Sequence, residues 1–136
     1  MFGKKPSKPL SRIDSLIGVG TKIEGNVIFA GGLRVDGEVK GDVRAVEGQP
    51  GTLVVSEQAR IEGEIRVSHL VVNGTIVGPV HATEFVELQP RSHLSGDVHY
   101  NSLEMHLGAV VEGRLAHKGA STEAKTVELK LAAKAH

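Results

Sequence analysis

Apolar residues in the middle of the chain recur in a short repeated unit of apolar–x–Gly–x–apolar form. The unit occurs six times, around Gly25, Gly41, Gly63, Gly78, Gly96 and Gly113. Its apolar positions are always Ile, Val or Leu, and among the residues directly beside the glycines only Val77 is apolar. This alternation with a period of two predicts strands with one buried side and one side in water.

The six units follow one another at a nearly constant interval. Successive glycines are 16, 22, 15, 18 and 17 residues apart, an average of 17.6. The long interval contains residues 47–51, Glu-Gly-Gln-Pro-Gly, a composition typical of a loop inserted into an otherwise regular turn. A period of this length indicates a solenoid in which each repeat is one turn.

Two further positions of the repeat fit stacked turns. The residue four before each glycine is small, as a tight corner requires: Thr21, Gly37, Ala59, Gly74, Ser92 and Ala109. The residue three after it forms a mostly basic row that should face outward: Ile28, Arg44, Arg66, His81, His99 and Ala116. The residues that should face inward and stack include Val43, Ile65, Val80 and Val98.

We therefore predict an all-β, single-stranded parallel β-helix of about six three-sided turns with flexible termini. Runs such as residues 33–35 and 53–55 would supply the other two faces. A β-sandwich is the alternative, because short strands and glycine turns suit it as well. A sandwich, however, does not need six copies aligned on their glycines.

Composition excludes several other classes. The 136 residues include 18 Val and 17 Gly but only four aromatic residues, which disfavours a bundle of long helices. There is no Cys, so disulfides, cysteine-ligated zinc and cysteine nucleophiles are excluded. No apolar run approaches the ~20 residues that span a bilayer, and we expect a cytoplasmic protein.

The net charge of zero conceals a segregation of charge along the chain. Residues 1–13 carry four Lys and Arg and no acid, residues 14–116 have a net charge of −6, and residues 117–136 have a net charge of +2. An acidic body argues against nucleic acid bound along it. The basic ends leave an anionic surface as a possible partner. We expect residues 117–136, rich in Ala and Lys, to form a flexible tail.

The ordered set of repeat motifs resembles the bactofilins, a family of bacterial cytoskeletal proteins. The matching segments are residues 17–27 (IGVGTKIEGNV), 33–43 (LRVDGEVKGDV), 70–80 (LVVNGTIVGPV), 93–98 (HLSGDV) and 108–113 (GAVVEG). The resemblance implies a right-handed parallel β-helix over residues 14–116. It also implies a scaffold that polymerises without nucleotide into non-polar filaments and recruits cell-wall-modifying or other cell-envelope and cell-shape factors.

Such filaments would join through the ends of the β-helix, like to like. We expect the following apolar residues near the two ends to form the polymerisation interface. At the N-terminal end they are Ile23, Val27, Phe29 and Val35. At the C-terminal end they are Leu103, Met105, Val110, Val111 and Leu115.

The start of the chain resembles the membrane-targeting peptide found in many bactofilins. Its expected membrane-binding residues are Met1, Phe2, Lys4, Lys5 and Lys8. An aromatic side chain at the tip of a disordered basic tail, here residues 1–13, can insert among headgroups while lysines contact anionic lipid. We therefore expect a peripheral position on the cytoplasmic face of the inner membrane. The alternative is a tail that only keeps the protein in solution.

We expect no catalytic site, no cofactor and no metal. His81 and His99 share a repeat position and could stack, but Arg44 and Arg66 in the same row indicate a solvated basic face rather than a metal site or catalysis. There is no phosphate-binding glycine loop of the Walker type. The alternative enzyme class is the left-handed β-helix acyltransferases, whose near-strict six-residue repeat the irregular glycine spacings do not follow.

Overall fold

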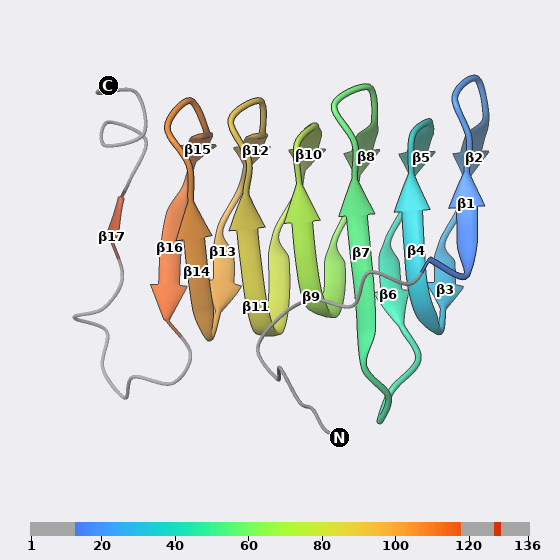
Figure 1. Cartoon of the computed structure of the whole chain (residues 1–136), viewed down its shortest axis with the longest axis horizontal. Helices are drawn as coiled ribbons and strands as arrows, with labels where there is room; N and C mark the ends of the chain where they lie inside the picture. Colours follow the sequence, from blue (N-terminus) through green and yellow to red (C-terminus); the bar gives the residue numbers. More distant parts are fainter. Residues whose placement is uncertain (1–12, 118–126, 129–136) are drawn as a thin grey trace.

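The fold is a parallel β-solenoid of six turns, each made of three short strands (Figure 1). The computed structural model describes residues 13–117 and the backbone of residues 127–128, and within these ranges every regular element is a strand. Successive turns stack directly on one another, with each strand paired in parallel to the strand one turn further along. The sequence prediction of an all-β, three-sided parallel solenoid is confirmed.

The strands fall into three faces that run the length of the rod. Face 1 consists of β1 (Ser15–Ile17), β4 (Gly31–Val35), β7 (Gly51–Val55), the second parts of β9 (Ile65–Val72) and β11 (Val80–Leu88), and β14 (Ser102–Met105). Face 2 consists of β2 (Lys22–Glu24), β5 (Glu38–Lys40), β8 (Arg60–Glu62), β10 (Thr75–Val77), β12 (His93–Ser95) and β15 (Val110–Glu112). Face 3 consists of β3 (Val27–Phe29), β6 (Val43–Ala45), the first parts of β9 and β11, β13 (Val98–Tyr100) and β16 (Arg114–His117). A last strand, β17 (Val127–Glu128), pairs antiparallel with β16.

The core consists of columns of aliphatic side chains that point inward from each face. On face 3, Val43, Ile65, Val80 and Val98 occupy successive positions of one column, and each is fully buried. This is the inward stack that the sequence predicted. Every turn contributes an aliphatic side chain at the equivalent position. Each of these side chains is therefore covered by the equivalent residues of the turns before and after it.

The repeated glycines stand at the corner between faces 2 and 3. A Cβ atom built on Gly41 would overlap the carbonyl oxygen of Gly25, and one built on Gly63 would overlap that of Gly41. The backbones of successive turns therefore touch at this corner, and only glycine leaves room for the contact. The repeat unit consequently spans a bend, and its two apolar residues belong to different faces.

Side chains beside the glycines complete the hydrogen bonding at this corner. The amide N–H of Asp42 donates to Oδ1 of Asn26 at 2.9 Å, and the amide of Glu64 donates to Oδ1 of Asp42 at 2.9 Å. Each side chain thus satisfies a backbone donor of the next turn that the bend has removed from the ladder. The polar residues after the glycines have a structural task as well as facing water.

The predicted inserted loop lies between β6 and β7 and projects beyond the other turns (Figure 1). It contains Gly48 with a φ of 82°, a value that favours glycine. The loop is anchored at its end by Ser68, whose hydroxyl donates to the Gly51 carbonyl and accepts from the Gly51 amide, both at 2.8 Å. The extra residues of the long interval are therefore accommodated outside the stack, and the columns keep their register.

Candidate assembly surfaces

The strand edges differ between the two ends of the rod. In the first turn β1, β2 and β3 each pair with a single strand, β4, β5 and β6, so within the described residues all three have an open edge. In the last turn β14 and β15 each pair with one strand, but β16 pairs with both β13 and β17. Open strand edges are templates for pairing with another chain. Both ends are candidates for assembly, and at the C-terminal end the outermost strand beside β16 is the two-residue β17.

Apolar side chains are concentrated on the first turn. Ile23 and Val27 are half-buried, although every residue stacked on them in the same two columns is at most 1% exposed. Leu16, Val19 and Ile28 are 60%, 68% and 58% exposed. Six large apolar residues are exposed in the described part of the chain, and four of them lie in the first turn or just before it. Such a concentration is typical of an interaction surface.

The C-terminal end exposes fewer apolar side chains. Leu103 and Met105 on face 1 and Val110 on face 2 are half-buried, and Leu107, in the turn between β14 and β15, is 78% exposed. Val111 and Leu115, the last members of the core columns on faces 2 and 3, are 0% and 1% exposed. The exposed apolar surface at this end therefore lies mainly on face 1 and at the corner between faces 1 and 2.

The outward row on face 3 forms a charged strip along the side of the rod. The rings of His81 and His99 stack with centroids 4.6 Å apart and an angle of 3° between their planes. A Glu64 carboxylate oxygen lies 2.8 Å from Nη2 of Arg66 and 3.2 Å from Nε2 of His81. The predicted stacking is confirmed, and the arginine in the group fits a solvated ion-pair network.

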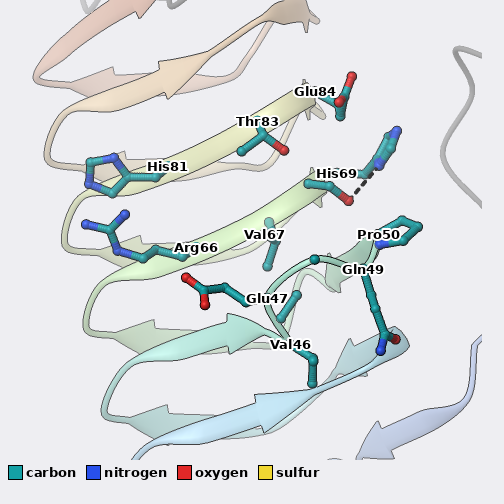
Figure 2. Close-up of a pocket in the computed structure, with 13 residues that line it drawn as sticks. Val46, Glu47, Gln49, Pro50, Arg66, Val67, His69, His81, Thr83 and Glu84 are labelled. Carbon is teal, nitrogen blue, oxygen red and sulfur yellow. Dashed lines mark hydrogen bonds between the residues drawn. The ribbon is translucent and has the colours of Figure 1, made fainter.

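A pocket of about 660 Å³ lies between the inserted loop and the strands β9 and β11 (Figure 2). Glu47 from the loop, Arg66 and His69 from β9, and Glu84 from β11 line it. Burial lowers the pKa of His69, while the nearby Glu84 carboxylate acts in the opposite direction. Ser68 Oγ lies 3.0 Å from Nδ1 of His69, but its hydroxyl is hydrogen-bonded to the backbone of the loop. The Ser68 hydroxyl therefore holds the end of the loop in place and is not free to act as an activated nucleophile.

Comparison with known proteins assigns the chain to a family. The family model described as "Bactofilin: Polymer-forming cytoskeletal" matches residues 15–116, about three quarters of the chain. The chain belongs to the bactofilin family. It is also similar to Bactofilin BacP of Myxococcus xanthus, with 28% identity over 106 residues, which are 77% of this chain and 42% of BacP. No solved structure gives a significant match.

Family membership determines the broad class of the protein. A bactofilin is a polymer-forming cytoskeletal protein, not an enzyme, and the acyltransferase alternative is set aside on that ground. Because the chain spans less than half the length of BacP, this assignment concerns the solenoid and not the whole of that relative. Among the residues described in this bactofilin, there is no helix with the length and apolarity needed to cross a bilayer.

The predicted polymerisation residues of this bactofilin fall into two groups. Five of them are half-buried near the ends of the rod: Ile23, Val27, Leu103, Met105 and Val110. The other four are buried in the core: Phe29, Val35, Val111 and Leu115. Val35 is wholly covered because it lies in the second turn, stacked on Ile17. A charge introduced at Val111 would enter the core itself, so this residue is unsuited to testing a junction.

The sequence reasoning missed the most exposed apolar residues, Leu16, Val19 and Leu107. One signal for this surface was available in the alignment of the repeats, where Ile28 heads an outward row that is otherwise mostly basic. The predicted membrane-binding residues Met1, Phe2, Lys4, Lys5 and Lys8 lie outside the described residues.

Proposed function

We propose that this bactofilin assembles without nucleotide into non-polar filaments by joining the ends of its solenoid like to like. In the proposed assembly, the N-terminal peptide holds the filaments on the cytoplasmic face of the inner membrane, and the filaments recruit cell-envelope or cell-shape factors. The observation that carries the assembly is the first turn, where three open strand edges coincide with exposed apolar side chains.

A like-to-like junction suits such an end on physical grounds. Covering Ile23 and Val27 would remove from water the apolar surface that remains open in their columns. Two copies can bring this surface together around a two-fold axis. Such a junction uses the surface of both copies completely, so no further copy can add at that end. Growth then requires a second, different junction at the C-terminal end. Leu107 and the open edge of β14 on face 1 are candidates for this junction.

Charge substitutions at exposed residues of each end test this scheme. Val19→Arg at the N-terminal end should stop growth at dimers joined by their C-terminal ends, and Leu107→Arg should give dimers joined by their N-terminal ends. The double variant should be monomeric in analytical ultracentrifugation without nucleotide. The matched control is Val77→Arg, which adds the same charge at an exposed apolar residue of a middle turn and should leave filaments intact.

The two single variants also distinguish this scheme from head-to-tail growth. In a head-to-tail filament every junction contains one N-terminal and one C-terminal end, so either single variant would yield monomers. Monomers from both single variants would contradict the non-polar filament. Long filaments in the double variant would contradict assembly through the ends.

The proposal for membrane attachment rests on the charge and composition of residues 1–13. Each lysine near an anionic surface contributes about 1 kcal/mol, so one tail binds weakly. A filament presents many tails together, and avidity would make the attachment firm. Phe2→Glu should abolish co-sedimentation of filaments with anionic vesicles, whereas Ser7→Glu, with the same change of charge, should only weaken it. Equal sedimentation of Phe2→Glu and the wild type would contradict insertion of the aromatic ring.

A further inference from the structure

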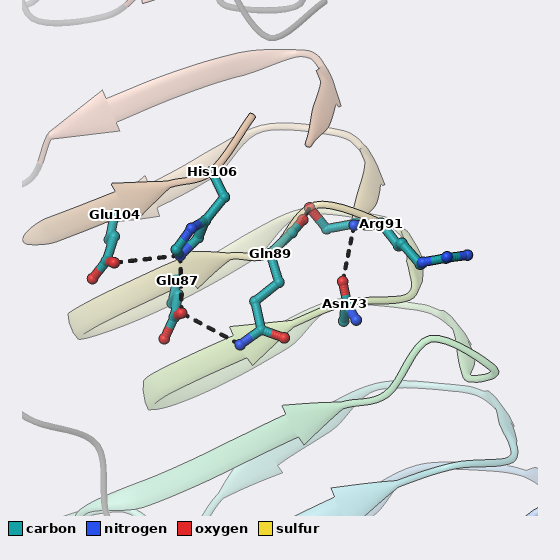
Figure 3. Close-up of polar contacts among 7 residues, drawn as sticks. Asn73, Glu87, Gln89, Arg91, Glu104 and His106 are labelled. Carbon is teal, nitrogen blue, oxygen red and sulfur yellow. Dashed lines mark hydrogen bonds and ion pairs between the residues drawn. The ribbon is translucent and has the colours of Figure 1, made fainter. Parts of the chain in front are cut away.

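Three side chains with metal-binding atoms meet on the outside of face 1, where the fifth and sixth turns stack (Figure 3). Nε2 of His106 lies 3.0 Å from Oε2 of Glu87 and 3.3 Å from Oε2 of Glu104. All three potential ligand atoms lie within 4.8 Å of one another. We propose that Glu87, Glu104 and His106 form a binding site for a divalent cation of the zinc type.

The register of the strands creates a charge conflict that a cation would resolve. Glu87 in β11 and Glu104 in β14 are direct partners across the parallel ladder. Like charges placed directly opposite each other on neighbouring strands are destabilising. Within residues 13–117, neither carboxylate forms an ion pair with a lysine or an arginine. His106 carries at most one positive charge against two negative ones, whereas a divalent cation would balance both carboxylates.

The distances and the types of atom fit zinc. Zinc binds histidine nitrogen at about 2.0–2.1 Å and carboxylate oxygen at about 2.0–2.2 Å, so tetrahedral ligand atoms lie about 3.3–3.5 Å apart. The distances from His106 to the two carboxylates, 3.0 and 3.3 Å, are close to this spacing. An imidazole in the set favours zinc over calcium, which prefers six to eight oxygen ligands.

The surroundings leave the site both supported and accessible. Nε2 of Gln89 donates to Oε2 of Glu87 at 3.3 Å (Figure 3), a contact of the kind that orients metal ligands from outside the site. The side chain of Glu87 is 22% exposed, that of His106 37% and that of Glu104 56%, so an ion can enter from solvent. Three protein ligands would leave one coordination position for water.

Other histidine–carboxylate pairs in the described residues lack this combination. His93 faces a single carboxylate, that of Glu112 at 3.6 Å. His81 contacts Glu64, but the guanidinium of Arg66 binds the same carboxylate and would repel a cation. Glu87, Glu104 and His106 form the only group of three possible ligands found in the described part of the chain.

A cation at this site would join the last turn to the turn before it. Glu87 belongs to the fifth turn, and Glu104 and the adjoining His106 belong to the sixth, next to the half-buried Leu103 and Met105. A cation that binds the folded protein but not the unfolded chain would raise the free energy of unfolding in proportion to the logarithm of the metal concentration. This inference does not rest on filament formation, because all three ligands come from one chain.

Titration of the full chain with Zn²⁺ alone, by calorimetry and by thermal melting, tests the site. We expect the wild type to bind Zn²⁺ and to melt at a higher temperature in its presence. His106→Gln and Glu87→Gln should each weaken binding at this site at least tenfold and remove the rise in melting temperature. His93→Gln is the matched control, because it removes a histidine that faces only one carboxylate, and it should behave like the wild type.

A spectroscopic signature separates this site from the other histidines. Co²⁺ in place of Zn²⁺ should give the visible absorption of tetrahedral cobalt in the wild type and in His93→Gln, but not in His106→Gln. Melting of His106→Gln without metal shows whether that variant is folded, and Glu104→Gln provides a second, independent loss of a ligand. Equal Zn²⁺ binding by the wild type and His106→Gln, or no binding by the wild type, would overturn the proposal and leave the group as a bridged ion pair.

Discussion

The first and last turns of the solenoid contain the same columns of apolar residues, but they leave different parts of them open. Ile23 and Val27 begin the columns of faces 2 and 3 and are half-buried. Val111 and Leu115 end those columns and are at most 1% exposed. At the C-terminal end, β17 pairs with Arg114 and Leu115 of β16 and is the outermost strand of that sheet. Position in a column therefore does not by itself decide whether a residue is available for assembly.

The asymmetry has a consequence for filaments. Within the described residues, the first turn and the residues just before it supply four exposed large apolar residues, whereas the last turn supplies one, Leu107, and has the two-residue β17 as its outermost strand on face 3. If both junctions form, they should differ in strength, because burial of apolar surface is the main favourable term in association. We expect filaments to break first at their C-terminal junctions.

The largest difference in stability should appear when a charge is placed either in the middle or at the open end of one core column on face 3. Val80→Asp would bury an unpaired carboxylate between Ile65 and Val98, at a cost of about 3–5 kcal/mol or more, and should unfold the domain. Val27→Asp, in the same column, leaves its charge near water and should cost much less. Urea unfolding of the two substitutions, each made in the Val19→Arg, Leu107→Arg background that should be monomeric, measures the difference. Equal losses in this background would show that Val27 is covered within the single chain.

A second comparison uses the glycine corner. Gly63→Ala would force a Cβ against the Gly41 carbonyl and should destabilise the fold by about 2–4 kcal/mol. Gly25→Ala meets open space in the first turn and bears only the strain of its φ of +140°, so it should cost about 1–2 kcal/mol. Thermal melting of both substitutions, each in the same monomeric background, gives the order. A more damaging Gly25→Ala would contradict the open space found at this glycine in the single chain.

The unequal ends can be compared directly through the dimers left by blocking one end at a time. Dimers of Leu107→Arg, joined at their N-terminal ends, should persist at lower protein concentration than dimers of Val19→Arg, by about tenfold for each 1.4 kcal/mol of difference. Sedimentation equilibrium over a range of concentrations measures both dissociation constants. The reverse order would refute the inference that the N-terminal junction is the stronger.

The smallest effect should come from His69, which lies between the ends beneath the inserted loop. Because burial lowers the pKa of His69 in the folded protein, the unfolded chain binds the extra proton more readily as the pH falls. The stability associated with neutral His69 is therefore present above about pH 6.5 and is lost as the pH falls through the lowered value. The melting temperature of His69→Gln should decline less between pH 7.5 and 5.5 than that of the wild type. An identical decline would mean that His69 is solvated.

The sequence by itself determined the features that repeat. Stacked turns place like residues over like, so an aligned set of Ile, Val and Leu predicts the columns, and an extra stretch between two repeats predicts the loop. The stacking of His81 on His99 followed from the same alignment and has the expected geometry. These features are readable because each depends only on a position within the period.

Only the tertiary structure decided the features that depend on a particular turn. The glycines prove to stand at a corner because of a contact between backbones of neighbouring turns, and residues next to one another in sequence cannot reveal that contact. Glu87, Glu104 and His106 meet because β11 and β14 pair in one register, at a place where the repeat units give no signal. The repeat does not encode why Val111 and Leu115 in the last turn are at most 1% exposed, whereas Val19 and Leu107 are 68% and 78% exposed. A repeating sequence specifies its interior, because every interior turn has the same two neighbours; an end lacks one of them, and only the folded chain determines what takes its place.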